Sequence, residues 1–382
     1  MQITSGYYIL ILILTPLVLN FKPKKYIFLG LSLAVFCAAC GSPLVFAVSL
    51  AYVLLPYLYV HLFKVKWPLF LILVISFLYL KRYDWIFKTI HIPYVIPFAI
   101  FGISYIVFRI IDYVINYDFL EKEEKGIVDY LNYVLNLYTI ICGPIMTFAN
   151  FRADFYSQKE SLSRTEILEC LNRAADGYVQ VLLLSNLCQK AASYGFDKLS
   201  SGSGFLYFLL FMIANVWYIY FNFNGYCDVV IALAKIAGFV LPENFNKPYL
   251  ANDISDFWNR QHSTLTKWIT SYIFTPVVKN MTEKMSLDVA QYIGFFVAFL
   301  VAGLWHGTTL NYLVYGILQA IGVCLTKLYT SVATKKLGGK KAFREFRKKK
   351  SVRTIEIFIT QAYIYFSFIF IGYDVIGLII GG

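Results

Sequence analysis

His306 is the ionisable residue of this chain whose position most suggests chemistry, because strongly apolar runs lie on both sides of it. An ionisable side chain at membrane depth is costly and commonly marks a functional cavity. Gly303 and Gly307 flank it and would let a backbone or a substrate approach closely, while Trp305 and Asn311 add an aromatic wall and an amide. A neutral imidazole suits proton transfer near neutral pH, so the pattern favours a functional role for His306.

A second histidine, His262, lies in the segment 241–280, which interrupts the apolar pattern. The spacing predicts a helix that is capped by Asn252 or Asp253 and runs to about Phe274. Its apolar face would carry Trp258, His262, Leu265, Ile269 and Tyr272. This helix is too polar to span lipid and too apolar for a free surface, which predicts an interfacial or re-entrant segment. A histidine on such a face is also compatible with a purely structural role.

The elements that must position these residues are membrane helices. Of 382 residues, 59% are apolar and only 15% are charged, against roughly 25% in an average soluble domain. This composition excludes a soluble globule and a disordered chain. We predict an all-α polytopic membrane protein, a single domain over 1–382 with roughly nine to eleven spans of about 20 residues. The candidate runs are 6–21, 26–42, 43–63, 67–83, 93–117, 128–150, 176–196, 204–240 (long enough for two), 287–305, 308–328 and 354–380.

The net charge of +12 is concentrated in one segment, 335–353, which holds ten basic residues and one acid. The excess is therefore local, and nucleic acid is not needed to explain it. We predict a cytoplasmic loop that fixes topology, with binding of anionic lipid or a partner as the alternative. Lysines after the first and third runs place the N-terminus outside the cytoplasm, and the first run lacks the features of a cleavable signal.

Other polar groups do not indicate a cofactor. The seven cysteines are scattered and form no disulfide framework, and Cys37 and Cys40 lie in an apolar run of small residues that favours helix packing over metal or redox chemistry. No P-loop or zinc-ligand histidine pair occurs in the sequence, so we predict no bound cofactor or metal. Three spacings predict ion pairs: Asp256 with Arg260, Arg109 with Asp112, and Asp228 with Lys235.

Four motifs in order resemble the membrane-bound O-acyltransferase family, in its bacterial branch of alginate O-acetylases and D-alanyl transfer proteins. They are Tyr220–Asp228 (YFNFNGYCD), Pro242–Asn246 (PENFN), Phe257–His262 (FWNRQH) and Leu304–Gly307 (LWHG). Weaker agreement extends to Gly102–Tyr105, Phe108–Arg109 and Gly143–Ile145, so that the resemblance covers about two thirds of the chain. The sequence departs from the pattern at Gln261, where the family has Trp, at Thr270 and Ser271, where it has Arg-Asp, and at 146–150, which lacks basic residues.

The resemblance implies acyl transfer from a thioester to a hydroxyl in a tunnel that crosses the membrane, with the donor entering from the cytoplasm. It implies that His306 is the general base and that His262 orients the acceptor or stabilises the oxyanion. The substrate site would also include Trp258, Asn259, Arg260, Trp305, Asn311, Asp228 and Asn246. The donor would be acetyl-CoA or an acyl carrier protein, used as a substrate rather than as a bound cofactor.

The acceptor is left open by these residues. Asp228 and Glu243 resemble the acetylase pattern, which favours acetyl transfer in the plasma membrane to an exported cell-envelope polysaccharide, or to an accessory acetyltransferase that passes the group on. Transfer of D-alanine to teichoic acid and O-acetylation of peptidoglycan are the alternatives. From other classes, a polysaccharide or lipid transporter could use His306 in a proton relay, and a scaffold could recruit a separate acetyltransferase.

Overall fold

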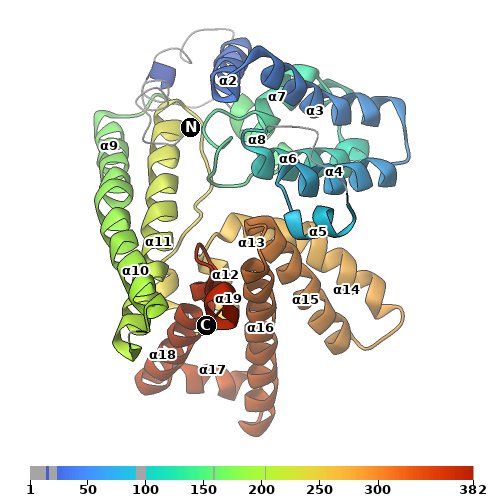
Figure 1. The fold of residues 1–382 in the computed structure, drawn as a ribbon. Helices are drawn as coiled ribbons and strands as arrows, with labels where there is room; N and C mark the ends of the chain where they lie inside the picture. Colours follow the sequence, from blue (N-terminus) through green and yellow to red (C-terminus); the bar gives the residue numbers. More distant parts are fainter. Residues whose placement is uncertain (1–13, 17–23, 92–99, 158–159, 203, 382) are drawn as a thin grey trace. The chain divides into compact units, whose positions relative to one another are not determined.

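The computed structural model of the chain describes residues 14–16, 24–91, 100–157, 160–202 and 204–381 (Figure 1). Within these ranges the secondary structure is helical and no strand occurs, which confirms the predicted all-α class. The chain divides into two compact units, which are described separately here. The first comprises Met1–Val179 and Gly225–Pro242, and the second comprises Gln180–Asn224 and Glu243–Gly382.

The first unit is built from short and medium helices. They are α2 (Lys24–Cys40), α3 (Pro43–Leu62), α4 (Trp67–Leu80), α5 (Asp84–Thr89), α6 (Ile103–Asn116), α7 (Ile127–Val134), α8 (Phe148–Tyr156) and α9 (Arg164–Val179). Ser42 caps α3 by accepting from the amide of Val45, and Pro43 occupies the first turn, where its missing N–H costs nothing.

Buried polar side chains hold the non-helical backbone of the first unit. Arg109 donates to the carbonyls of Val134 and Thr139 at 2.9 and 2.5 Å. Asp112 accepts from the Tyr133 hydroxyl and the Phe148 amide, both at 2.7 Å. Each side chain therefore binds the 134–148 region, where backbone groups without helical partners must be satisfied in an apolar interior.

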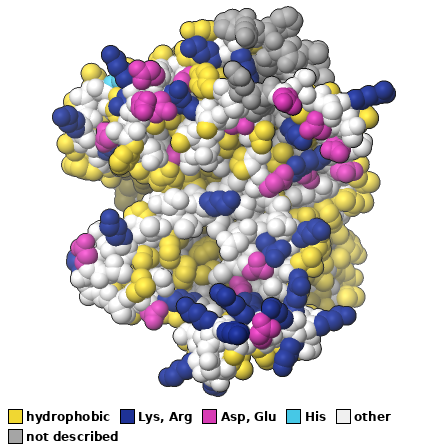
Figure 2. All heavy atoms as spheres, turned by 180° about the vertical axis from the view of Figure 1, so that it is seen from behind, with side chains coloured by type: hydrophobic (Ala, Val, Ile, Leu, Met, Phe, Trp, Pro, Cys, Tyr) yellow, Lys and Arg dark blue, Asp and Glu magenta, His cyan; other side chains and the backbone are white. Residues whose placement is uncertain are grey.

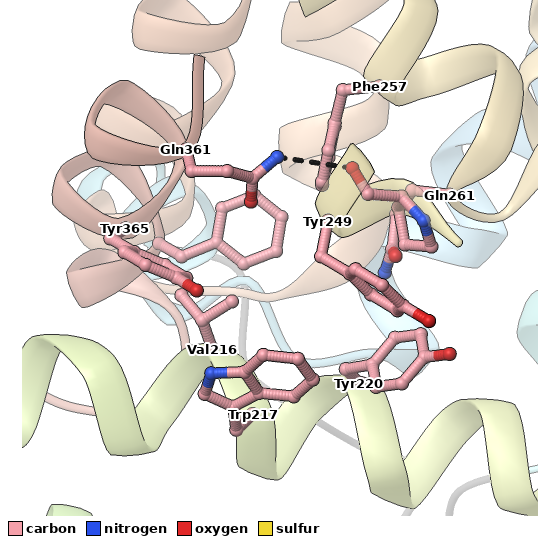
Figure 3. Close-up of a pocket in the computed structure, with 10 residues that line it drawn as sticks. Val216, Trp217, Tyr220, Tyr249, Phe257, Gln261, Gln361 and Tyr365 are labelled. Atoms are coloured by element: carbon pink, nitrogen blue, oxygen red, sulfur yellow. Dashed lines mark hydrogen bonds between the residues drawn. The ribbon is translucent and has the colours of Figure 1, made fainter. Parts of the chain in front are cut away.

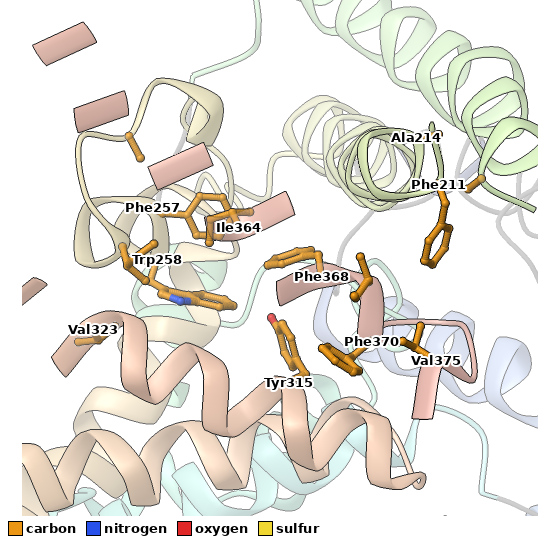
Figure 4. Packing of buried hydrophobic residues seen from close by; sticks show 14 residues of the cluster. Phe211, Ala214, Phe257, Trp258, Tyr315, Val323, Ile364, Phe368, Phe370 and Val375 are labelled. Carbon is orange, nitrogen blue, oxygen red and sulfur yellow. The ribbon is translucent and has the colours of Figure 1, made fainter. Parts of the chain in front are cut away.

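The second unit contains the long helices and the histidines. A π-helical turn (Gln180–Ser185) leads into α10 (Asn186–Ser200), and α11 (Phe205–Ile236) passes from this unit into the first. There follow α12 (Ile254–Arg260), α13 (Ser263–Ile269), a π-helical turn (Thr270–Phe274), α14 (Thr275–Thr282), α15 (Leu287–His306), α16 (Leu310–Lys336), α17 (Lys340–Lys348), α18 (Lys350–Ser367) and α19 (Val375–Gly381). Phe257, Trp258, Tyr315 and Phe368 meet in the buried aromatic core of this unit (Figure 4).

Helices α15 and α16 form an antiparallel pair that glycine makes possible. A Cβ on Gly303 would collide with the carbonyl oxygen of Tyr312, and one on Gly307 would collide with the Tyr312 ring. The expected close approach beside His306 is thus confirmed, and the neighbour that approaches is α16. This packing fixes the end of α15, where His306 lies.

Four described helices are long and apolar enough to cross a membrane: α3, α11, α15 and α16. Exposed apolar side chains such as Leu55 and Leu58 on α3, and Leu325 and Leu328 on α16, give these helices outward faces that suit lipid. The total of nine to eleven spans stays a prediction. The run 6–21 lies outside the described residues except for 14–16. The predicted orientation of the N-terminus concerns this run and stays a prediction.

Three expected elements differ from the structure. The run 128–150 is helical only at α7 and α8, since the backbone between them is held by Arg109 and Asp112. The run 204–240 contains one helix, α11, about 48 Å long at 1.5 Å per residue, rather than two spans. The basic segment 335–353, predicted as a loop, is largely helical: it comprises the end of α16, all of α17 and the start of α18.

Candidate active site

His262 lies at a sharp break between two short helices, where a continuous helix to Phe274 was predicted. Helix α12 ends at Arg260, and His262 adopts a left-handed conformation with φ 48° and ψ 45° before α13 begins. This conformation is uncommon for a residue with a side chain. It turns the chain so that His262 is buried, with only 3% of its surface exposed. The predicted helix is therefore wrong at this residue, and the break is what directs the imidazole inward.

Asn244, which is fully buried, holds this break together. Its side-chain oxygen accepts from the Thr264 amide at 3.2 Å, from the Thr264 hydroxyl at 2.8 Å and lies 3.3 Å from Nδ1 of His262. Its carbonyl accepts from the Ser263 amide at 3.0 Å. One asparagine thus fixes the backbone on the far side of the turn and the orientation of the imidazole.

These contacts determine which nitrogen of His262 carries the proton. Because the Thr264 backbone N–H can only donate, the Asn244 atom that it meets must be the amide oxygen. His262 Nδ1 must then donate to that oxygen, which leaves Nε2 unprotonated in the neutral ring. Burial, and then the nearby His306, lower the pKa of His262 well below its ordinary value, so the neutral form prevails near pH 7.

The unprotonated nitrogen points into an aromatic setting. Nε2 of His262 is buried and has no hydrogen-bond partner among the residues that the structure describes. The Phe223 ring lies edge-on to the His262 imidazole, with 4.5 Å between the ring centroids. The centroid of the Trp305 ring lies 6.1 Å from that of His262 and 4.8 Å from that of His306. The Trp305 ring therefore neighbours both imidazoles, so the two histidines lie near one another. Of the two, only His306 is among the residues that line the cavity described next, and a tunnel shared by both histidines stays a prediction. A buried acceptor of this kind is suited to a hydroxyl of a bound molecule.

A cavity of about 990 Å³ opens beside His306 in the second unit. One face of α15 lines it from Asp288 to His306, a length of about 27 Å, and Ala298 and Ala302 on that face leave room. The cavity is therefore elongated and reaches His306 at one of its ends.

The other end of the cavity carries most of its charged side chains. Lys327, Lys335 and Lys340 line the cavity together with hydroxyl side chains of α16, and they outnumber the two acids of the lining, Asp253 and Asp288. Lys327 pairs with Asp288 at 2.8 Å. Lys and Arg side chains gather on this end of the second unit, around α17 (Figure 2). Since His306 lies at the opposite end of α15, a ligand with an anionic head at the lysines could reach the histidine with an extended arm.

Arg347 holds α17 against this cavity. It donates to Asp253 at 2.8 Å and to Glu356 at 2.9 Å. Asp253 also caps α12 by accepting from the Asp256 amide at 2.8 Å, so the basic helix is joined to the helix that precedes His262.

Two of the predicted substrate-binding residues line the cavity, and two others lie at the turn that carries His262. Trp258 and Asn259 line it, and the Trp258 indole donates to Gln319 at 3.2 Å. Arg260 makes the predicted pair with Asp256 at 2.8 Å and also binds the Asn246 carbonyl at 3.3 Å. Arg260 and Asn246 thus brace the turn that carries His262.

Two predicted site residues serve other contacts. Asn311 donates to Asp374 at 2.8 Å and accepts from the Ile376 amide at 3.0 Å, which anchors α19. Asp228 belongs to the first unit, where Arg173 of α9 pairs with it at 2.8 Å. The structure therefore gives neither side chain a place in the cavity wall.

Sequence reasoning did not select Asn244 or Lys327, and it assigned Lys335 and Lys340 to a loop that fixes topology rather than to the site. Asn244 is the third residue of the PENFN motif, so the motif could have pointed to it, but its role depends on its contact with His262, 18 residues later. Lys327 and Lys335 lie two turns apart on α16, so their shared face was open to detection by helical spacing.

Comparison with known proteins decides the family. The sequence profile of the membrane-bound O-acyltransferase family matches residues 50–368, which is most of the chain. The chain belongs to this family. Together with the apolar helices, the match identifies a multi-pass membrane protein and confirms the resemblance drawn from the four motifs.

Curated relatives in this family have several named activities. The chain is 28% identical over 227 residues to a probable alginate O-acetylase from Pseudomonas syringae, 29% over 228 residues to a teichoic acid D-alanyltransferase from Bacillus subtilis, and 30% over 210 residues to a peptidoglycan O-acetyltransferase from Helicobacter pylori. These matches cover 59%, 58% and 55% of this chain. They span 42%, 57% and 39% of the relatives, so the chain matches about half of their length.

Proposed function

We propose that this protein is a membrane O-acyltransferase that moves an acetyl group from a cytoplasmic thioester to a hydroxyl of an exported envelope polysaccharide, or to an accessory acetyltransferase. The observation that carries the proposal is the elongated cavity that joins His306 to a basic end. Family membership and the names of the three relatives support acyl transfer as the reaction class.

The cavity suits a thioester donor that has an anionic head. Coenzyme A carries phosphates at one end and the acyl group at the other, and a carrier protein presents its acyl group on a phosphorylated arm. In either case the phosphate would bind Lys327, Lys335 and Lys340 through charge-assisted hydrogen bonds, and the arm would follow α15 to His306. The basic end would face the cytoplasm of a plasma-membrane protein, in keeping with the distribution of Lys and Arg in such proteins.

The reaction needs one base and a fixed geometry. The acceptor oxygen attacks the thioester carbonyl carbon, and His306 takes the hydroxyl proton as the new C–O bond forms. The C–S bond then breaks, and the proton passes from His306 to the departing thiolate, so that an ester and a free thiol result. Base assistance of this kind contributes roughly 10²–10⁴-fold to a rate, and holding both reactants together adds to it.

His262 supplies orientation in this scheme. With Nδ1–H bound to Asn244, neutral His262 can accept a hydrogen bond at Nε2 but cannot donate one there. Of its two predicted roles, orienting the acceptor hydroxyl is therefore supported over stabilising an oxyanion, which requires a donor.

Replacing His306 tests the proposal. The full chain would be purified in detergent, supplied with radiolabelled acetyl-CoA and envelope material from a strain that lacks the gene, and assayed for label in the polymer. His306→Ala should reduce transfer at least 100-fold, while His61→Ala, an exposed histidine of α3, should leave it unchanged. Transfer by the His306 variant at the wild-type rate would overturn the assignment.

A further inference from the structure

A second hollow of the second unit is lined by Gln261, the residue before His262, and is distinct from the large cavity. It is a narrow slot with an enclosed volume of about 20 Å³, enough for about one water molecule. Figure 3 shows Gln361 and Tyr365 on one side of it, Gln261, Tyr249 and Tyr220 on the other, and Trp217 across its floor.

Gln261 gives the slot an accessible polar group. The residue as a whole is only 6% exposed and lines the slot, and its amide atoms are not among the buried polar atoms that lack a partner. Its backbone N–H is bound to the Phe257 carbonyl at 2.7 Å, so the residue is held firmly in place. The donor and acceptor positions of the amide are therefore available to a ligand in the slot.

The slot combines this amide with aromatic faces and a second amide. Gln361 donates to the Pro248 carbonyl at 3.1 Å and keeps its own side-chain oxygen directed at the slot. The Trp217 and Tyr220 rings both pack on the Tyr249 ring, with centroid distances of 5.8 and 5.9 Å. Apolar ring faces with a few placed amides are suited to a molecule that has C–H faces and hydroxyl edges, which describes a sugar.

Electrostatics narrows the class of sugar. None of the described residues that line the slot is charged, in contrast to the lysine-rich end of the cavity. A carboxylate or phosphate held against this lining would find no counter-charge. The slot is thus suited to an uncharged, hydroxyl-bearing edge of a sugar, and its small enclosed volume admits about one hydroxyl group.

The slot is connected to His262, although neither histidine is among its lining residues. Gln261 precedes His262 directly, and a ladder of rings joins the slot to the imidazole: Tyr220 contacts Phe245, Phe245 contacts Phe223, and Phe223 contacts His262. We propose that the slot is the acceptor subsite, which recognises a neutral sugar residue of the acceptor polymer through Gln261 and Gln361. This inference rests on the proposed function, which it deepens by naming the class of acceptor.

The test measures sugar binding without any acyl donor, so its result does not depend on acyl transfer. Detergent-purified full chain would be applied to an array of neutral, uronate-containing and polyol-phosphate oligosaccharides, and the dissociation constants of bound glycans would then be measured by titration. We expect binding to neutral glycans, weakened at least tenfold in Gln261→Trp, which fills the slot, and in Gln361→Ala. Gln189→Trp, at an exposed site on α10, is the matched control and should bind as the wild type does.

Three results would overturn the inference. They are binding confined to uronate or phosphate polymers, absence of binding to every glycan, and binding that Gln261→Trp leaves unchanged. Gln261→Leu, which is closer in size to the native residue, covers the case in which the tryptophan variant does not fold, and it should show the same tenfold loss because the amide is removed.

Discussion

Asn244 offers the most informative single perturbation of the site. Asn244→Ala removes the acceptor of three hydrogen bonds, from the Thr264 amide, the Thr264 hydroxyl and His262 Nδ1. Net contributions of about 0.5–1.5 kcal/mol for each bond, with buried donors left unsatisfied, give a loss of about 2–4 kcal/mol in the free energy of unfolding. The proton on His262 is then no longer fixed at Nδ1, and we expect acyl transfer to fall at least tenfold.

Two measurements separate these effects. Thermal unfolding of the purified chain, followed with a thiol-reactive dye on its cysteines, should show a midpoint several degrees below that of the wild type. The transfer rate is measured well below that midpoint, where the variant is folded. Asn222→Ala is the matched control, because it removes one bond, to Ser185 at 3.3 Å, from an exposed asparagine, and it should cost at most about 1 kcal/mol.

A conservative variant tests the proton assignment directly. Asn244→Asp keeps an oxygen acceptor for both Thr264 and His262 Nδ1, so it should recover most of the transfer rate lost in the alanine variant. The added carboxylate should also raise the pKa of His262 and move the acidic limb of the pH–rate profile upward. A normal transfer rate in Asn244→Ala, or no recovery in a folded Asn244→Asp, would refute the reasoning.

Three further outcomes are expected. Folding lowers the pKa of His262, so below about pH 6.5 the unfolded chain binds more protons than the folded chain, and the stability should fall as the pH drops through that value. His262→Gln should flatten this pH dependence in thermal scans at pH 5.5–7.5. An unchanged slope in the variant would contradict the prediction. Arg347→Met removes both ion pairs that join α17 to its neighbours and should cost about 1–3 kcal/mol, visible as a lower unfolding midpoint, whereas the exposed pair of Lys348 should be dispensable in Lys348→Met. Gly303→Ala should destabilise the α15–α16 pair by about 1–3 kcal/mol, while Gly30→Ala, which meets open space in α2, should not; equal midpoints would exclude close packing at Gly303.

The fold class and the choice of the two histidines could be predicted because both depend on local composition, whereas their placement in one site was implied only by the resemblance to the family. Apolar runs of helical length predict helices wherever they occur, and two histidines in otherwise apolar or aromatic surroundings are visible as exceptions. The predicted runs 287–305 and 308–328 agree with α15 and with the start of α16, and Gly307 separates the two helices, but α16 continues to Lys336.

The remaining features depend on contacts between distant residues. Helical spacing around Trp258 and Leu265 was correct on both sides of His262, but the left-handed turn between them is stabilised by Asn244, 18 residues earlier. The partner of Asp228 is likewise not Lys235 on the same helix but Arg173, 55 residues away. Sequence periodicity carries no information on such pairs, so the turn and the ion pair could be found only from the structure.

The two hollows of the second unit differ in charge, and this difference bears on how donor and acceptor could be kept apart. The cavity that reaches His306 is lined by Lys327 and Lys335, while the slot at Gln261 has no charged side chain among its described lining residues. An anionic donor head would be stabilised in the cavity and penalised in the slot, and a neutral sugar would gain nothing from the lysines. In the proposed scheme each substrate would occupy its own hollow, and the two would meet at the histidines, which Trp305 neighbours on both sides.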